Sequence, residues 1–378
     1  MQAGIYIHIP FCAKKCVYCD FYSLSNRESD IDRFTNSMIS EIENTDSDPV
    51  KDWQFSTVFF GGGTPSLLEA PQLEKIINAL HRVFDLSRVN EITLEANPGE
   101  APYTRLKAYR ELGINRLSIG FQSFQPDLLH FLSRIHNEKD CFNTFSNAIK
   151  AGFDNINVDM IFNIPGQSCA IWEADLKKIL RLNPNHISAY SLTVESGTPL
   201  HRQVVKKLIH MPDEDTDILM FTTTRDLLNN AGYPAYEISN FAQPGYECRH
   251  NLGYWQLRPY LGFGPSAHSY DVRRRRWNTA SLDAYLNTIK NGGTPIAGFE
   301  MITETDRFNE LIFNGLRMTT GIHIPSLKQL YPGDFHQFLK RTLSYWKELK
   351  ITNDHLTLFE NGVLLADEIA ADLFLIPD

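Results

Sequence analysis

The sequence predicts an α/β fold, a partial (β/α)6 TIM-like barrel followed by a smaller C-terminal helical domain that resembles a winged helix. Two observations carry this prediction. Short apolar, β-branched runs recur along the first half of the chain, and segments with helical periodicity separate them, which is the pattern of a parallel sheet covered by helices. The character of the sequence then changes near residue 305, where helical segments precede a short strand-like stretch.

Six βα units fit the first half of the chain. Each intervening segment is long enough for the crossover of about a dozen residues that parallel strands require. Pro71 and Pro102 suit the first turn of a helix, and Gly113 and Gly152 suit helix ends. The expected strands are 4–10, 57–61, 91–97, 116–121, 155–162 and 186–192, and the expected helices are 28–45, 71–84, 102–112, 138–151 and 170–181. In such folds the chemistry gathers at the carboxyl ends of the strands.

The later part of the chain divides into further regions. We expect a core over residues 1–240, an irregular segment over 241–300 and a C-terminal domain over 301–378. Residues 232–270 are rich in aromatic residues, Pro and Gly and lack clear periodicity. The C-terminal domain is expected to contain helices 307–318, 325–330 and 334–349, strand-like residues 351–358 and a last amphipathic helix.

Composition excludes several classes of protein. The 378 residues include 36 Lys and Arg against 45 Asp and Glu, a formal net charge of −9, which argues against a nucleic-acid-binding role. The third helix of the C-terminal domain mixes basic and acidic residues, so we expect no nucleic acid partner there. No apolar run approaches the roughly 20 residues of a membrane span, and the N-terminus shows no leader. We therefore expect a cytoplasmic protein that reaches the inner face of the membrane only through partners.

Three of the six cysteines stand close together, as Cys12, Cys16 and Cys19 directly after the first expected strand. A structural zinc site needs four ligands, usually in two pairs, and no second pair of Cys or His stands nearby at matching spacing. Three thiolates on one short loop suit three corners of a [4Fe–4S] cluster and leave one iron open to another ligand. We predict that these cysteines are the metal ligands.

The Cys-x3-Cys-x2-Cys pattern after the first strand resembles the radical S-adenosylmethionine (SAM) superfamily, in which SAM binds the open iron. The run from Gly61 to Pro65 after the second strand is similar to the family's glycine-rich loop. In the family this loop holds the methionine amino group. The resemblance implies that SAM is a cofactor and that its contacts are Tyr6, Gly62, Gly63, Thr64, Glu95, Gln122, Arg134 and Asp159.

The segments 6–12, 115–124 and 157–167 narrow the resemblance to the branch that contains the oxygen-independent coproporphyrinogen III dehydrogenase HemN and the heme chaperone HemW. Phe21 stands where the dehydrogenase signature has a fourth cysteine, and few residues precede Tyr6, so the enzyme's N-terminal arm is missing. Both features are more similar to HemW. We expect no dehydrogenase activity and assign no catalytic residue.

A second motif agrees with the HemW side of the branch. His250, Asn251, Tyr254 and Trp255 match its His-Asn-x-x-Tyr-Trp pattern, which the resemblance associates with heme. Histidine is a common axial ligand of heme iron, and aromatic rings offer flat apolar surface to a porphyrin. Cys248 is an alternative ligand, and His268 in the later glycine-rich stretch is a further site candidate.

The sequence therefore predicts a heme chaperone that carries a [4Fe–4S] cluster and SAM and transfers heme to heme-dependent proteins. By resemblance, the recipients are respiratory-chain proteins and the chain forms a homodimer. The alternative is a radical SAM enzyme that decarboxylates a porphyrinogen oxidatively. The catalytic scaffold alone does not decide between them.

Overall fold

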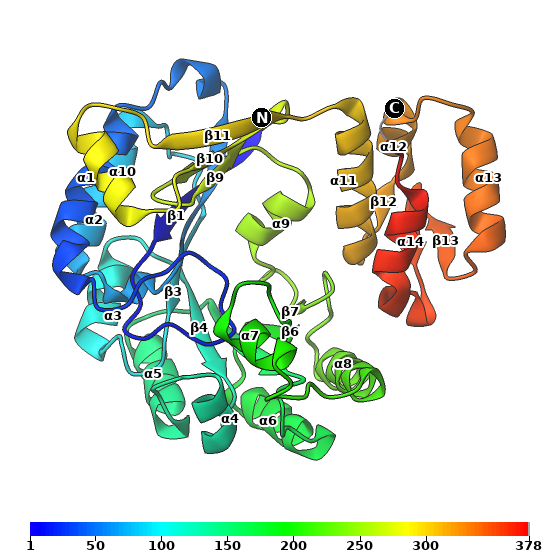
Figure 1. The fold of residues 1–378 in the computed structure, drawn as a ribbon, viewed down its shortest axis with the longest axis horizontal. Coiled ribbons are helices and arrows are strands. Elements are labelled where there is room, and N and C mark those ends of the chain that lie inside the picture. The colour runs from blue at the N-terminus through cyan, green and yellow to red at the C-terminus, as the bar shows by residue number, and fades with distance from the viewer. Residues whose placement is uncertain (377–378) are drawn as a thin grey trace.

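The computed structural model describes residues 1–376 and shows a partial barrel with a separate helical domain beside it (Figure 1). Six parallel strands build the barrel wall, and each pairs with the next along the chain. Their bounds are β1 (Gln2–Ile9), β2 (Gln54–Gly62), β3 (Glu91–Ala96), β4 (Arg116–Gln122), β5 (Ile156–Phe162) and β6 (His186–Ser191). The fold class predicted from the sequence is confirmed.

The sheet continues beyond the six strands at both ends, to eleven strands in the order β11-β10-β9-β8-β1-β2-β3-β4-β5-β6-β7. Strand β8 pairs parallel to β1, although more than 200 residues of chain lie between them. Strands β9, β10 and β11 then follow as antiparallel neighbours. The added strands are β7 (Asn240–Ala242), β8 (Tyr260–Phe263), β9 (His268–Tyr270), β10 (Arg274–Asn278) and β11 (Ile296–Met301).

Helices cover the outer face of the barrel, as Figure 1 shows for α1, α2, α3 and α5. Helix α5 begins at a capping box in which the Asn137 side chain accepts from the Asp140 amide. Apolar side chains of these helices and of the strands form one large core, as in Phe34, Leu80 and Trp172, which are fully buried. The helices of this part are α1 (Ile31–Glu43), α2 (Ala70–Val83), α3 (Tyr103–Glu111), α4 (Pro126–Phe131), α5 (Glu138–Lys150), α6 (Cys169–Leu182), α7 (Pro199–Val205), α8 (Glu214–Asn230), α9 (Arg249–Trp255) and α10 (Leu282–Lys290).

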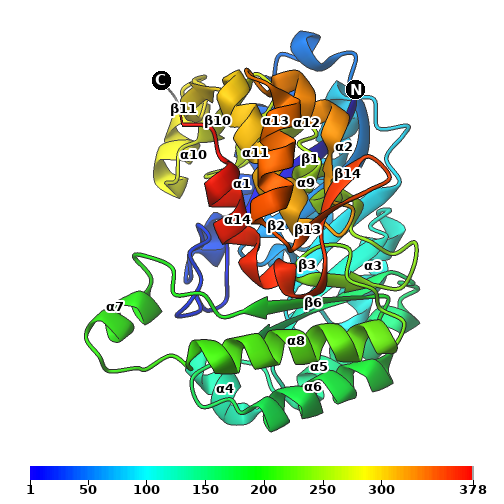
Figure 2. The same cartoon turned by 90° about the vertical axis from the view of Figure 1, so that its right-hand side faces the viewer.

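The C-terminal part has its own core around Phe308, Ile312 and Leu356. It combines α11 (Glu304–Arg317), α12 (Ile324–Leu330), α13 (Phe335–Tyr345) and α14 (Ala366–Leu373) with β12 (Ile322–His323), β13 (Leu349–Thr352) and β14 (His355–Leu358). The three strands form a small antiparallel sheet. Figure 2 views these helices face-on, in front of the barrel. The side-chain Nδ2 of Asn314 donates to the backbone carbonyl of Tyr254 at 3.3 Å, which joins α11 to α9.

The segment expected to be irregular differs most from the prediction. Residues 241–300 contain helices α9 and α10 and four strands of the large sheet. Helix α8 and helix α7 were also not expected. Short strands that pair with distant partners carry little local periodicity, because their burial is set by register and not by alternation. Within residues 1–376 no helix is long and apolar enough to cross a membrane.

Candidate functional site

The three clustered cysteines lie on a loop that leaves the carboxyl end of β1 and folds back on itself; we call residues 10–24 the cysteine loop. The Cys12 amide donates to the Leu24 carbonyl at 2.9 Å, and the Leu24 amide donates to the Pro10 carbonyl at 2.7 Å. Two side chains from other segments reach the sulfurs at 3.5 Å: Thr64 Oγ1, just after β2, reaches Cys12, and Arg134 Nη1, between α4 and α5, reaches Cys16. The loop is therefore held at the edge where the parallel strands end.

The thiols share one electrostatic environment. Burial raises the pKa of Cys12, and the neighbouring Cys16 raises it further. Burial also raises the pKa of Cys19 to about 11, with contributions from Cys16 and Cys12 in the same direction. Cys16 thus raises the pKa of both Cys12 and Cys19, so the three sulfurs lie close together, and a bound cation is the partner that lets thiolates coexist.

The glycine-rich loop after β2 packs directly on the backbone of the cysteine loop. The Gly63 amide donates to the Ile9 carbonyl at 2.7 Å. A Cβ atom on Gly63 would stand 2.6 Å from the carbonyl oxygen of Phe11. Gly62 has a φ of +106°, and a Cβ there would meet the ring of His8 at 2.5 Å. Both glycines are needed for the close approach of two backbones, which explains the pattern.

Two carboxylates lie inside the barrel, Glu95 near the end of β3 and Asp159 in the middle of β5. Oε2 of Glu95 accepts from the amide of Gly62 at 3.2 Å. Burial, and then the charge of Asp159, raise the pKa of Glu95 to about 8. Asp159 accepts from Ser118 Oγ at 3.0 Å and from Asn157 Nδ2 at 2.7 Å. The carboxylates are therefore positioned by the sheet and face the same interior as the loop.

Arg134 and Gln122 are two further predicted SAM contacts. The Arg134 guanidinium donates to the Gly120 carbonyl at 2.8 Å, to the Cys16 sulfur and to Oδ1 of Asn97. Its Nε has no partner among the described residues. Gln122 adopts a φ of +65° at a bulge in the β4–β5 pairing, which turns its side chain at the strand end. A guanidinium with a free donor at this place suits a carboxylate ligand.

Tyr6 reaches the site from β1. Its hydroxyl bonds to Nδ1 of His8 at 3.1 Å, and Nε2 of His8 donates to the Tyr22 carbonyl at 2.8 Å. Burial lowers the pKa of His8 to about 4, so the ring is neutral. The pair connects the barrel interior to the cysteine loop. We use "cofactor edge" for the cysteine loop together with the predicted SAM contacts Tyr6, Gly62, Gly63, Thr64, Glu95, Gln122, Arg134 and Asp159.

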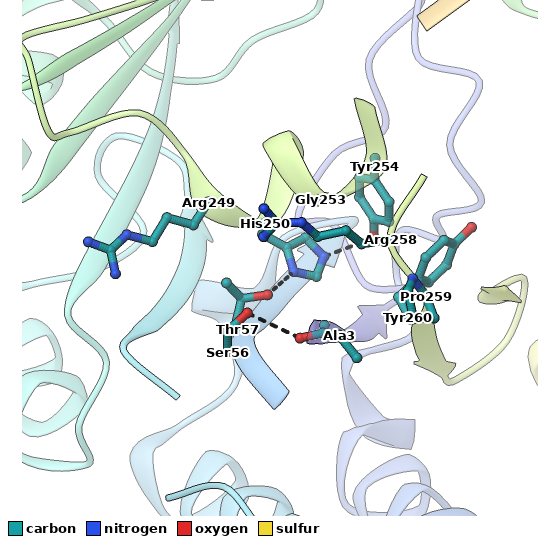
Figure 3. A pocket seen from close by; sticks show the side chains of 11 residues that line it. Ala3, Ser56, Thr57, Arg249, His250, Gly253, Tyr254, Arg258, Pro259 and Tyr260 are labelled. Carbon is teal, nitrogen blue, oxygen red and sulfur yellow. Dashed lines mark hydrogen bonds between the residues drawn. The ribbon is translucent and has the colours of Figure 1, made fainter. Parts of the chain in front are cut away.

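The second motif lies on helix α9, and Figure 3 shows two of its residues, His250 and Tyr254, from close by. His250 is 3% exposed. Its Nδ1 bonds to Thr57 Oγ1 at 2.8 Å and its Nε2 to the Tyr254 hydroxyl at 2.9 Å, both drawn in Figure 3. The ring stacks on Phe59 with centroids 5.1 Å apart, and burial lowers its pKa to about 3. In this conformation neither ring nitrogen is free for iron.

The other predicted residues around α9 have different environments. Asn251 and Trp255 are half-buried, and Cys248 is fully buried with its sulfur 3.7 Å from Glu91 Oε1. His268 is exposed and lies beside Trp277, with ring centroids 5.9 Å apart. The structure thus brings the cysteines and predicted SAM contacts together. The predicted heme residues lie on another element, although the ring of His250 stacks beside the predicted SAM contact Tyr6 with centroids 6.5 Å apart.

Glu91 holds α9 against the barrel. Its two carboxylate oxygens accept from the amides of Arg249 and His250, each at 3.0 Å. Glu91 is 4% exposed, and the buried Arg116 stands close enough to feel its charge. A negative charge at the start of a helix compensates its unpaired amides. The motif is therefore part of a pre-organised buried network.

Comparison with known proteins decides the family. The model of the radical SAM superfamily matches residues 6–179, and the model of the HemN C-terminal domain matches residues 302–365. The heme chaperone HemW of Bacillus subtilis is 34% identical over 96% of this chain and 97% of its own length. HemW of Lactococcus lactis is 32% identical over 99% and 97%. This chain belongs to the HemW family of radical SAM proteins.

The solved structures agree on the fold of this HemW family member. Coproporphyrinogen III oxidase HemN from Escherichia coli superposes with a TM-score of 0.83 over 99% of this chain and 90% of its own, at 21% identity. That likeness shows a shared architecture, including the C-terminal part. It says nothing of a shared reaction.

The cofactors of a radical SAM protein are a [4Fe–4S] cluster and SAM, and this HemW family member offers residues that fit both. Within residues 1–376 no three His, Cys, Asp or Glu side chains converge on a single metal ion. Three thiols on one short loop suit three corners of a [4Fe–4S] cluster, whereas a structural zinc site needs a fourth ligand. The glycine cradle and the free Nε of Arg134 fit a ligand with an amino acid head group.

Several contacts in this HemW family member escaped the sequence reasoning. Asn97 donates to Thr64 Oγ1 at 2.9 Å and accepts from Arg134, so it joins two predicted contacts. His8 joins Tyr6 to the cysteine loop, and Glu91 joins the start of α9 to the barrel. Asn97 ends a predicted strand, and the rule that chemistry gathers at strand ends could have found it. Glu91 begins the same strand, at the opposite end, where that rule gives no signal.

Proposed function

We propose that this protein is a heme chaperone, which binds heme and passes it to heme-dependent proteins. The observation that carries the proposal is the identity of about one third with HemW proteins over nearly the whole of both chains. Phe21 supports it from this chain's own residues, because this exposed side chain in the cysteine loop replaces the fourth cysteine of the dehydrogenase signature.

Cys12, Cys16 and Cys19 hold the cluster in this proposal, and their loop fixes the spacing of the three thiols. When bound, the cluster supplies one-electron chemistry to SAM. Arg134 pairs with the SAM carboxylate through its free donor, and the glycine-rich loop brings its backbone close to the amino acid part. Tyr6, Thr64, Glu95, Gln122 and Asp159 contact the remainder of SAM.

His250, Asn251, Tyr254 and Trp255 contact heme in the same proposal. Because both nitrogens of His250 are hydrogen-bonded, iron ligation by this residue requires that the bond to Thr57 or Tyr254 break first. Respiratory-chain proteins as recipients and a homodimer as the assembled form belong to the proposal as well.

One experiment separates the chaperone from a porphyrinogen-decarboxylating enzyme. The chain is reconstituted anaerobically with iron and sulfide, then assayed for coproporphyrinogen turnover with SAM and a one-electron reductant, and for heme binding and transfer to an apo-cytochrome. We expect heme transfer without decarboxylation. Decarboxylation at enzymatic rates would contradict the chaperone function, and Cys12→Ala, which should lose the cluster, controls for turnover that does not depend on it.

His250→Ala tests the residue assignment separately in the same assay. Weaker heme binding with an unchanged iron content supports contact at α9. Unchanged heme binding overturns the assignment to His250 and leaves the chaperone function standing.

A further inference from the structure

A cavity of about 710 Å³ lies against the sheet extension, which begins at β8 beside β1, and Tyr260 at its border contacts Tyr254 of helix α9 with ring centroids 4.7 Å apart. It is bounded by the end of α1, by the loop from α10 to β11 and by strands β8 to β10; we call it the β10 groove. None of the predicted cluster, SAM or heme residues lines it. In Figure 1 these elements lie together at one corner of the barrel.

Arginine side chains with free donors face this groove. Arg273, Arg274 and Arg276 line it. Arg274 pairs only loosely with Asp271, at 3.4 Å, and within residues 1–376 Arg273 and Arg276 make no ion pair. On the opposite face of β10, by contrast, Arg275 is paired with Glu300 and Glu310 at 2.8 and 2.6 Å. Arg273 and Arg276 therefore enter the groove without an ion pair among the described residues, although the acidic residues Glu41, Asp46 and Asp271 also line it.

The one buried acid of the groove does not neutralise these arginines directly. Glu41 accepts from the Gly264 amide at 2.8 Å, from Asn278 Nδ2 at 2.6 Å and from the Tyr285 hydroxyl at 2.6 Å. Its hydrogen-bonding capacity is thus used by the scaffold. Burial, and then the nearby Arg274, lower the pKa of Arg276, while the charges of Asp271 and Glu41 raise it, so the acids of the groove compensate this buried cation only in part.

Exposed apolar side chains on strand β11 lie beside the arginines of the groove. Edge strand β11 carries Ile296, Phe299 and Met301, which are 39%, 60% and 61% exposed. Its register places Phe299 opposite Arg276 and Met301 opposite Arg274, so both apolar side chains share a face with the arginines. Edge strands usually carry charges or Pro instead of exposed large apolar side chains. The combination suits a ligand that is apolar over most of its surface and anionic at one end.

We propose that the β10 groove binds a tetrapyrrole dicarboxylate, with Arg274 and Arg276 on the carboxylates and the side chains of β11 against the macrocycle. The volume falls in the range of about 300–1,000 Å³ that is typical of small-molecule sites. Arginine is the side chain best suited to paired carboxylates. This inference rests on the proposed function and adds a site that is separate from His250, whose nitrogens are both occupied.

The test titrates the full-length chain with hemin and with hemin dimethyl ester, in which the carboxylates are masked, and follows the heme absorption band. We expect wild type to bind hemin about tenfold more tightly than the ester, because charge-assisted hydrogen bonds to carboxylates are lost in the ester. Arg274→Glu with Arg276→Glu should weaken hemin binding about tenfold and abolish the preference. Lys139→Glu with Lys150→Glu, an equal change of charge on exposed positions of α5, should leave both unchanged.

The outcomes separate this site from the proposed function. A wild type that binds no hemin contradicts the proposed function itself. A wild type that binds hemin, with the same affinity and preference in the Arg274 and Arg276 double variant, overturns the groove and leaves the chaperone function. Arg274→Gln with Arg276→Gln repeats the test should the reversed charges prevent folding. Loss of hemin binding in His250→Ala alone, with full binding in the arginine variant, also overturns the groove.

Discussion

The cofactor edge and the region around helix α9 differ in how their polar groups are used. At the cofactor edge the sulfurs receive only contacts of 3.5 Å, and Arg134 Nε has no partner among the described residues. Around α9, both nitrogens of His250 and both oxygens of Glu91 are bonded within the protein. The free donor of Arg134 suits a bound ligand, whereas the bonded nitrogens of His250 indicate a scaffold that must open before it can bind one, although Nε of Arg116 near Glu91 also lacks a partner among the described residues.

The largest expected effect is a loss of stability when the contacts that hold α9 are removed. Glu91→Ala removes the acceptor of two α9 amides and a negative charge near Arg116, which is 2% exposed. Burial opposes the charge of Arg116, while Cys248 and Glu91 raise its pKa. Hydrogen bonds to a charged group contribute about 1.5–3 kcal/mol each, so the loss of these two should lower the free energy of unfolding, measured in urea, by about 3 kcal/mol or more.

Glu138→Ala is the control for Glu91→Ala. Glu138 pairs with Lys178 at 2.7 Å but is 42% exposed, and such surface pairs contribute about 0–1 kcal/mol. Amide hydrogen exchange at Arg249 and His250 should accelerate in the Glu91 variant alone. A Glu91 variant as stable as the Glu138 variant would show that α9 is held by other contacts.

The pH dependence of stability tests a buried histidine beside the cofactor edge. His136 lies at the cofactor edge, 6% exposed, and its Nε2 donates to the Phe121 carbonyl at 3.0 Å. Burial, and then the charge of Arg134, lower its pKa to about 4 from 6.5. Below pH 6.5 the unfolded chain therefore binds a proton at this histidine, whereas the folded chain binds it only near pH 4. The free energy of unfolding keeps its full value above pH 6.5 and falls as the pH drops toward 4.

The expected loss from His136 is about 1.4 kcal/mol per pH unit, or about 3 kcal/mol by pH 4. Urea unfolding between pH 7 and 4 measures it. His136→Gln, which keeps a donor of similar reach, should flatten the curve by that slope. A variant with the same slope as wild type would place the acid sensitivity in other histidines.

The sequence predicted the six barrel strands to within about three residues at each end and missed the strands that extend the sheet. The difference has a physical cause. The barrel strands are buried on both faces and read as continuous apolar runs, whereas β10 consists largely of arginines and belongs to the sheet only through its pairing with β9 and β11. No local sequence pattern predicts that pairing.

The site shows the same division. The cysteines and the glycine-rich loop stand in contiguous motifs, so their role could be predicted from spacing. The contacts of Glu91 and Asn97 join residues on different elements, as in Glu91 with the start of α9, more than 150 positions away in the chain. Such contacts depend on the assembled barrel. The sequence also predicted His250 as a heme contact without indicating that Thr57 and Tyr254 occupy its ring.

A smaller change tests the cofactor edge. Gly63→Ala forces a methyl group against the carbonyl oxygens of Phe11 and Ile9, at 2.6 and 2.8 Å, and backbone atoms cannot rotate away. Overpacking of this kind costs about 1–3 kcal/mol. Because the strain falls on the cysteine loop, iron bound per chain after anaerobic reconstitution should drop by more than the loss of stability alone explains. Full iron content with reduced stability would separate the glycine cradle from the cluster.

The same substitution on α9 has the smallest expected effect and the opposite sign. Gly253 lies in the helix, and a Cβ there would have its nearest neighbour, Arg258 Cδ, at 3.9 Å. Alanine in a helix is favoured over glycine by about 1 kcal/mol, so Gly253→Ala should raise the free energy of unfolding by up to that amount. Because α9 lies apart from the cysteine loop, the iron content should stay at the wild-type level. If Gly253→Ala instead lowered the iron content, the two regions would be coupled, and the closed network around His250 would have to be read as a support of the cofactor edge.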